Sequence, residues 1–153
     1  MKKGFTLVEL LIVVAILGIL AAVGVVSYTG FLGSAKENAT KANHKNIVSY
    51  MQAEVTKCSL GDSTLNLVDS GGSPSPWGCN SGSSTDDYVS RFVAHFQGSF
   101  KNPYNAESQA AENSICPSEL GRTGISKTDE NTISVQTRYV DGENCVTAQV
   151  GVE

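Results

Sequence analysis

The feature that most constrains this chain is an apolar run near its start, from Phe5 to Val26, in which Thr6 and Glu9 are the only polar side chains. A helix of about 20 apolar residues is long enough to cross the roughly 30 Å hydrocarbon core of a bilayer. The run is longer than the about 7–15 apolar residues of a secretory signal peptide, and Glu9 interrupts it, which argues against a signal peptide. The sequence therefore favours a membrane-spanning helix.

Lys2 and Lys3 lie just ahead of this run. Because basic residues stay on the cytoplasmic side, the positive-inside rule places the start of the chain in the cytoplasm and the remainder outside. The side chains sum to a net charge of −4. Without Lys2 and Lys3 the balance would be 9 basic against 15 acidic side chains, which is −6. An acidic chain repels phosphate backbones, so nucleic-acid binding by the bulk of the chain is disfavoured and only a local basic patch could support it.

All four cysteines lie beyond the apolar run, at Cys58, Cys79, Cys116 and Cys145. None belongs to a C-x-x-C pair, so a zinc site is disfavoured. An even number of widely spaced cysteines favours two disulfides, which require an oxidising compartment outside the cytosol. Three pairings are open from the sequence; we favour the local ones, Cys58 with Cys79 and Cys116 with Cys145. Four free buried thiols are the disfavoured alternative.

The charge of Glu9 needs a partner. An acidic side chain near the bilayer centre costs about 2.5–3.5 kcal/mol on insertion scales, and less toward an end. No Lys, Arg or His occurs between Lys3 and Lys36. Cleavage between Gly4 and Phe5 would create a charged amine on Phe5, at nearly the same depth as Glu9.

The stretch KGFTLVEL, followed by a long uncharged segment, resembles the amino terminus of type IV pilins over residues 2–28. The resemblance implies that residues 1–4 are a leader, that a prepilin peptidase cuts after Gly4, and that the new amino group of Phe5 is methylated. It implies that Glu9 meets the Phe5 amine of a neighbouring subunit as a homopolymeric filament assembles. It also implies residence in the inner membrane among lipid before assembly, an inner-membrane assembly machinery, and then an extracellular pilus, or fimbrium.

Elementary electrostatics is compatible with that role for Glu9. Two unit charges about 4 Å apart gain about 4 kcal/mol at an effective dielectric constant of 20, which would offset the burial of the carboxylate. A same-chain pairing of Phe5 with Glu9, four residues apart on one helix face, is the alternative and stays open.

The chain departs from the family at Val26, where many members have a nearby proline. Gly18, Gly24, Gly30 and Gly33 occur instead. Glycine in a helix costs about 1 kcal/mol relative to Ala, so residues 18–33 could be soft enough to unwind in part. Alternatively, the glycines allow neighbouring helices to approach closely. The sequence does not decide between the two.

The pattern after residue 26 predicts an α+β fold. Residues 27–58 continue the helix with one apolar stripe, and Gly61 suits its end. The stripe consists of Ala35, Ala39, Ala42, Ile47, Met51 and Val55. Residues 59–153 are expected to form a globular head, against which the second half of the helix packs. The head contains an extended surface loop over 59–85, a short helix over 86–97 capped by Ser84 or Thr85, and a C-terminal antiparallel sheet.

That sheet is expected from the alternating segments TISVQTRYV and CVTAQVGV around the turn DGEN, with a third strand near 122–126. Trp77 is expected to pack on the head, while His44 and His95 are expected to face solvent. The acidic clusters TDEN and DGEN have no EF-hand spacing, so solvated turns are favoured over calcium sites.

No nucleophile motif, phosphate loop or paired histidine is present. We therefore predict no catalytic residue, no cofactor and no metal, and interpret the chain as a filament subunit rather than an enzyme. The filament would serve adhesion to an extracellular surface, surface motility and, as a further option, DNA uptake. A pseudopilin of a type II secretion system and a membrane-anchored binding module that never polymerises are the alternatives.

Overall fold

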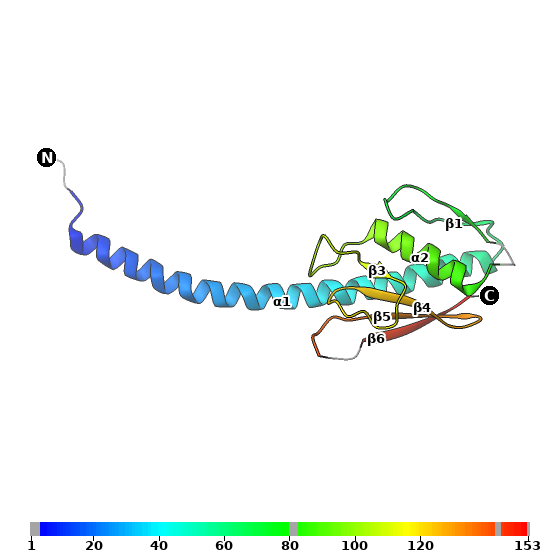
Figure 1. The fold of residues 1–153 in the computed structure, drawn as a ribbon. Coiled ribbons are helices and arrows are strands. Elements are labelled where there is room, and N and C mark those ends of the chain that lie inside the picture. The colour runs from blue at the N-terminus through cyan, green and yellow to red at the C-terminus, as the bar shows by residue number, and fades with distance from the viewer. Residues whose placement is uncertain (1–3, 80–82, 143–144, 153) are drawn as a thin grey trace. The chain divides into compact units, whose positions relative to one another are not determined.

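The computed structural model describes residues 4–79, 83–142 and 145–152. The chain divides into two compact units, Met1–Ala35 and Lys36–Glu153. A single helix, α1 (Leu7–Ser59), runs through both units (Figure 1). Its bounds confirm the prediction of one long helix that ends near Cys58. Within the described residues, α1 is the helix long and apolar enough to cross a membrane, judged by length and composition.

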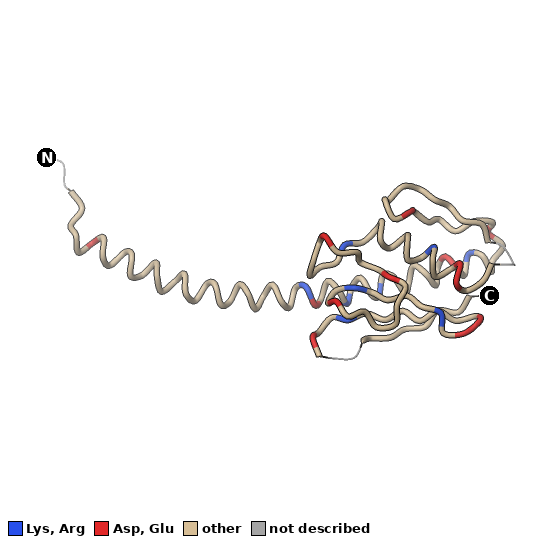
Figure 2. The backbone as a smooth tube through the Cα atoms, in the orientation of Figure 1, with Lys and Arg blue, Asp and Glu red and all other residues tan. Residues whose placement is uncertain are grey.

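In the first unit, the large apolar side chains from Phe5 to Leu32 are 38–83% exposed. Figure 2 shows one acidic position near the start of α1, followed by an uninterrupted uncharged stretch. Such a continuous apolar surface is unfavourable in water, so this unit requires lipid or other protein chains around it.

In the second unit, one stripe of α1 is buried against the head. It consists of Thr40, His44, Ile47, Met51, Glu54 and Val55. The hydrophobic core joins this stripe to the strands through Met51, Ile133 and Val135, and all three are fully buried. The predicted α+β arrangement of a long helix packed by its second half against a C-terminal sheet is confirmed.

The sheet has four strands in the order β3–β4–β5–β6. They span Ala111–Glu112, Thr123–Asp129, Thr132–Thr137 and Val146–Gly151. β5 pairs antiparallel with both β4 and β6, as predicted, but β3 pairs parallel with β4. The expected antiparallel strands are therefore confirmed, and β3 is an additional strand that was not predicted. The segment between β3 and β4 crosses the outer face of the sheet at Gly124. At the end of this segment, Arg122 Nη1 lies 2.6 Å from Glu112 Oε2 on β3. After this crossing, β4 runs in the same direction as β3.

The second helix, α2 (Thr85–Ser99), packs Phe92 and Phe96 into the core. Ser84 is its N-cap: the Asp87 backbone N–H donates to Ser84 Oγ at 3.3 Å, and the Ser84 backbone N–H donates to Asp87 Oδ2 at 2.9 Å. This reciprocal capping box explains why the helix begins at Thr85.

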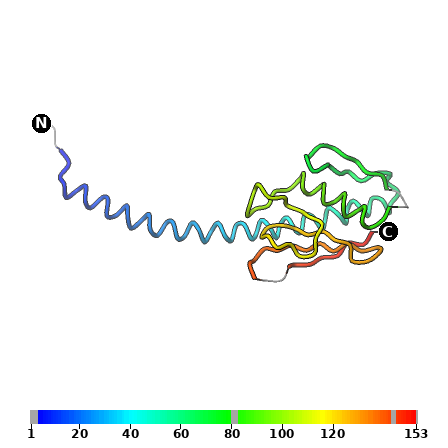
Figure 3. Tube along the Cα trace, in the orientation of Figure 1, coloured from blue at the N-terminus to red at the C-terminus, as the bar shows by residue number. Residues whose placement is uncertain are grey.

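The described part of the segment between α1 and α2 contains two short strands that were not expected. Figure 3 traces its path over the head. Strands β1 (Thr64–Leu65) and β2 (Trp77–Gly78) pair antiparallel. The prediction of a plain surface loop over 59–85 was wrong here, because Leu65 and Leu67 alternate with polar residues and turn into the core. Trp77 packs edge-on against Tyr88, with 4.8 Å between ring centroids, which confirms its expected packing on the head.

Gly98 allows the turn after Leu67 to lie directly on the end of α2. A Cβ at Gly98 would lie 2.1 Å from the Asp69 carbonyl oxygen and 2.8 Å from the Gly72 nitrogen. Both neighbouring atoms belong to backbone, so neither can move without shifting the turn.

We expect Gly98→Ala to lower the free energy of unfolding by about 1–3 kcal/mol, as overpacking does. The gain of up to about 1 kcal/mol in helix propensity would not offset this loss. Urea titration of the full chain in detergent, followed by Trp77 fluorescence, measures the change. Gly151→Ala is the matched control, since its Cβ would meet its nearest atom at 3.9 Å. Equal stability of the two variants would contradict the close approach.

Both histidines are buried, so the expectation that they face solvent was wrong. His44 is 8% exposed and His95 is 7% exposed. His44 Nδ1 lies 2.8 Å from Thr137 Oγ1 on β5. His95 Nδ1 accepts a hydrogen bond from the Val68 backbone N–H at 3.0 Å. His44, Ile47 and Met51 follow one another at helical spacing, so the sequence could have predicted that His44 lies on the buried face of α1.

Burial lowers the pKa of His95, although Glu54 opposes the shift, and burial also lowers the pKa of His44. Between the folded and unfolded pKa values the unfolded chain binds more protons, so stability rises with pH. We expect full stability above about pH 6.5, the ordinary pKa of histidine, and a progressive loss below it. Urea titrations at stepped pH measure this. His95→Gln, whose amide oxygen can still accept from Val68, should weaken the dependence; unchanged stability down to about pH 5.5 would contradict the assignment.

Candidate processing and assembly site

The start of α1 is organised around Thr6 and Glu9. The Thr6 backbone N–H donates to Glu9 Oε2 at 2.8 Å, and Thr6 Oγ1 donates to the same oxygen at 2.7 Å. In return, the Glu9 backbone N–H donates to Thr6 Oγ1 at 3.3 Å. This is a capping box with Thr6 as the N-cap and Glu9 at the third helical position. The carboxylate also lies at the positive end of the helix dipole, which favours its charge.

Gly4 and Phe5 lie outside the helix and are exposed. A Cβ at Gly4 would meet no atom within 4 Å, so the fold itself does not require glycine there. The bond between Gly4 and Phe5 is therefore in an exposed segment next to a helix start, an arrangement that an enzyme cleaving this bond can reach. The rest of the expected leader, residues 1–3, lies outside the described residues.

The start of α1 bears on the same-chain pairing of Phe5 with Glu9, while the pairing between subunits stays a prediction. Because α1 begins at Leu7, Phe5 is not on a helix face four residues before Glu9. Glu9 Oε2 instead accepts hydrogen bonds from Thr6, which the sequence reasoning did not assign. The T-x-x-E pattern of a capping box was the signal that could have identified Thr6.

Around Glu9 the surface is apolar on all sides. Residues 4–35, the described part of this unit, contain no Lys, Arg or His, so none of them can offer a cationic side chain to the carboxylate. α1 is unbroken across residues 18–33. A Cβ at Gly18, Gly24, Gly30 or Gly33 would meet nothing within 4 Å in this single chain.

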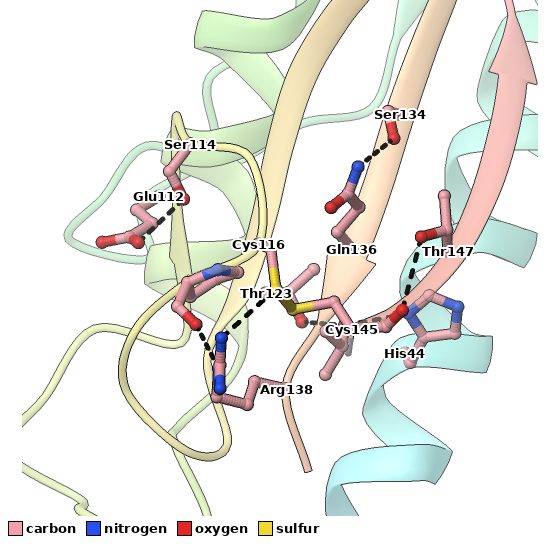
Figure 4. The surroundings of a disulfide bond; sticks show 12 residues. His44, Glu112, Ser114, Cys116, Thr123, Ser134, Gln136, Arg138, Cys145 and Thr147 are labelled. Carbon is pink, nitrogen blue, oxygen red and sulfur yellow. Dashed lines mark hydrogen bonds between the residues drawn. A yellow bond between two sulfur atoms is a disulfide. The ribbon is translucent and has the colours of Figure 1, made fainter. Parts of the chain in front are cut away.

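The head is closed by two disulfides, Cys58–Cys79 and Cys116–Cys145. The first joins the last turn of α1 to the residue after β2, and the second joins the segment between β3 and β4 to the start of β6 (Figure 4). Arg138 Nε donates to the Pro117 carbonyl oxygen at 2.7 Å, next to the second bridge. These contacts fix the segment around Cys116 on the sheet.

No group of side chains that could hold a metal ion occurs within residues 4–79, 83–142 and 145–152. The acidic cluster TDEN forms the connection between β4 and β5, where Asp129 Oδ1 accepts from the Asn131 backbone N–H at 3.0 Å. The cluster DGEN lies in part outside the described residues, so its expected form stays a prediction.

One comparison with known proteins falls on the same amino-terminal segment. Residues 1–25 match the family described as the prokaryotic N-terminal methylation motif. The amino terminus of this chain therefore carries that motif. The chain is 32% identical over 94 residues to the type IV major fimbrial protein FimA of Dichelobacter nodosus. The aligned residues make up 58% of this chain and 56% of FimA.

A second pilin is similar over a shorter segment. The type IV major pilin protein PilA of Myxococcus xanthus is 49% identical over 44 residues, which are 29% of this chain and 20% of PilA. The chain thus spans about half or less of the length of these type IV pilins. No solved structure matches it. The comparisons therefore show likeness to part of each of these pilins, and the family match lies within residues 1–25.

Proposed function

We propose that this chain is a structural subunit of a type IV pilus, processed between Gly4 and Phe5 and polymerised through the first half of α1. The observation that carries the proposal is the single carboxylate of Glu9, held by Thr6 at the first turn of an exposed apolar helix. The capping box with Thr6 does not neutralise the charge, and an anion on such a surface usually has a cationic partner.

Cleavage would supply that cation. The new amine on Phe5 would be charged, and the Phe5 amine of a neighbouring subunit could approach Glu9 once the apolar helices bundle. Glu9 Oε2 accepts both hydrogen bonds from Thr6, while Oε1 takes part in neither. Oε1 is thus the atom that we propose as the acceptor for the neighbour. Since the unprocessed chain lacks the amine, assembly would select for processed subunits.

The proposal includes the route of the subunit. The chain would first reside in the inner membrane, with α1 in contact with lipid and the disulfide-bonded head outside the cytoplasm. A prepilin peptidase would cleave it and methylate Phe5, and an inner-membrane machinery would then draw it into an extracellular homopolymer. Adhesion is the role we favour for the displayed head, with motility and DNA uptake as further roles of the filament.

Two measurements test this proposal. Mass spectrometry of the protein from its native cell should find a mature chain that begins at a methylated Phe5. Electron microscopy of sheared cells should find long fibres that contain the chain. Surface-exposed protein that retains Lys3 would indicate an anchored binding module instead. A processed chain without long fibres would indicate a pseudopilin of a secretion system.

A further inference from the structure

The outer face of strands β4, β5 and β6 is uncharged. On β4, β5 and β6 the side chains that alternate with the core residues carry only hydroxyl and amide groups. In cross-strand register, Ser126 lies opposite Ser134, which lies opposite Gln149. The neighbouring row places Gln136 opposite Thr147. Figure 4 shows Ser134 and Gln136 on β5 and Thr147 on β6, close to the Cys116–Cys145 disulfide.

A groove follows this face, with a volume of about 350 Å³. Its floor is formed by Ser126, Thr128, Ser134, Gln136, Thr147 and Gln149, and Ile115 and Lys127 complete its lining. Ile115 is 72% exposed although it is apolar. We refer to this set of residues as the hydroxyl–amide groove.

The wall of the groove is held in place. The wall is the segment after β3 that contains Ile115, and it crosses the sheet directly over Gly124. Glycine is needed there, because a Cβ at this position would lie 2.4 Å from the Ser114 carbonyl oxygen. The Cys116–Cys145 disulfide then ties the residue after Ile115 to the residue before β6. A preformed wall reduces the ordering cost of binding, so the groove is suited to a ligand.

Nearby charges are already paired. Lys127 Nζ lies 3.4 Å from Asp86 Oδ2, and Glu112 Oε2 lies 2.6 Å from Arg122 Nη1. Among the residues that line the groove in the described part of the chain, Lys127 is the one with a charge. Since Lys127 is already paired with Asp86 and the other described lining residues are uncharged, burying the charge of a charged partner there would be costly.

We propose that the hydroxyl–amide groove binds neutral polysaccharide. Sugar hydroxyls donate and accept hydrogen bonds at once, as do Ser and Thr hydroxyls and the two ends of a Gln amide. The exposed methyl groups of Ile115 supply an apolar contact for the C–H face of a sugar ring. A second copy of this chain fits less well, because both helices and strands β3 and β4 of its head carry charged side chains.

This proposal rests on the proposed function in that it names the surface to which the pilus would adhere. The test uses the full chain in detergent micelles, so filament assembly does not enter it. The probes are microcrystalline cellulose, insoluble chitin and starch granules, with alginate beads as the charged comparison. We expect retention on at least one neutral polysaccharide and none on alginate, and retention should persist at high salt because no ion pair is involved.

Gln149→Glu, which places a charge on the groove floor at almost unchanged size, should weaken retention about tenfold. Ile115→Ser should also weaken it. Gln52→Glu is the matched control, since Gln52 is exposed on α1 away from the groove lining. Unchanged unfolding curves would show that the variants still fold. No retention on any neutral polysaccharide, or equal retention of Gln149→Glu and Gln52→Glu, would overturn the proposal. Altered filaments without polysaccharide binding would reassign the groove to contacts between subunits.

Discussion

Glu9→Gln should leave the subunit in the membrane with a normal head but lower the yield of sheared filaments by at least about tenfold. The amide oxygen of Gln can still accept the hydrogen bonds from Thr6, so the start of α1 is kept. The lost quantity is the attraction between a carboxylate and the Phe5 amine of a neighbour, worth up to about 4 kcal/mol at 4 Å and an effective dielectric constant of 20. Immunoblots of the sheared fraction and of the membrane fraction measure the subunits in filaments and the subunits left in the membrane.

Glu37→Gln is the matched control for this experiment. Glu37 lies on the same helix and pairs with Lys41 at 2.6 Å. A solvent-exposed pair of this kind contributes at most about 1 kcal/mol. Its filament yield should therefore stay near that of the natural chain. Normal filament yield from Glu9→Gln, with complete cleavage after Gly4, would remove the role of Glu9 between subunits.

Replacing both Cys58 and Cys79 by Ser should lower the free energy of unfolding by about 3 kcal/mol. The bridge closes a sequence separation of 21 residues, and the cost follows from the larger conformational entropy of the open unfolded chain. Since the segment between the two cysteines contributes Leu65 and Leu67 to the core, local opening should expose it first. Urea titration and protease cleavage within residues 60–78 measure the two effects.

The other bridge provides the comparison. Replacing Cys116 and Cys145 by Ser opens a sequence separation of 29 residues and should cost a similar amount, about 3–4 kcal/mol. This variant should also lose polysaccharide retention, because Ile115 is then no longer held beside β6. The Cys58 and Cys79 variant should keep retention under conditions where it stays folded. Loss of retention in both double variants would indicate a general loss of folding rather than a specific effect on the position of Ile115.

The sequence predicted those parts of the fold that depend on local pattern. The apolar run and the stripe through Met51 predicted one long helix, and helix capping at Ser84 follows from the position of a hydroxyl before an aromatic stripe. The alternating strands near Val135 and Val150 likewise predicted their pairing, because one face of an antiparallel sheet must be buried.

The parts that sequence reasoning missed depend on contacts between distant segments. The parallel pairing of β3 follows from a crossing over Gly124, and the burial of His95 follows from the Val68 N–H that it meets. Neither partner is visible from local spacing. Thr6 is different, since its capping pattern with Glu9 was readable, and attention to the charge of Glu9 alone left the hydroxyl unassigned.

The exposed apolar surface of α1 has a consequence for turnover. A subunit released into water would have to shield that surface, so the solution monomer is not a stable resting state. Under the proposed function, a subunit would therefore exchange only between two apolar environments, the bilayer and the fibre interior. A fibre that shortens at its base would return intact subunits to the same lipid pool from which it grew, so one supply of protein could serve many cycles of growth and withdrawal.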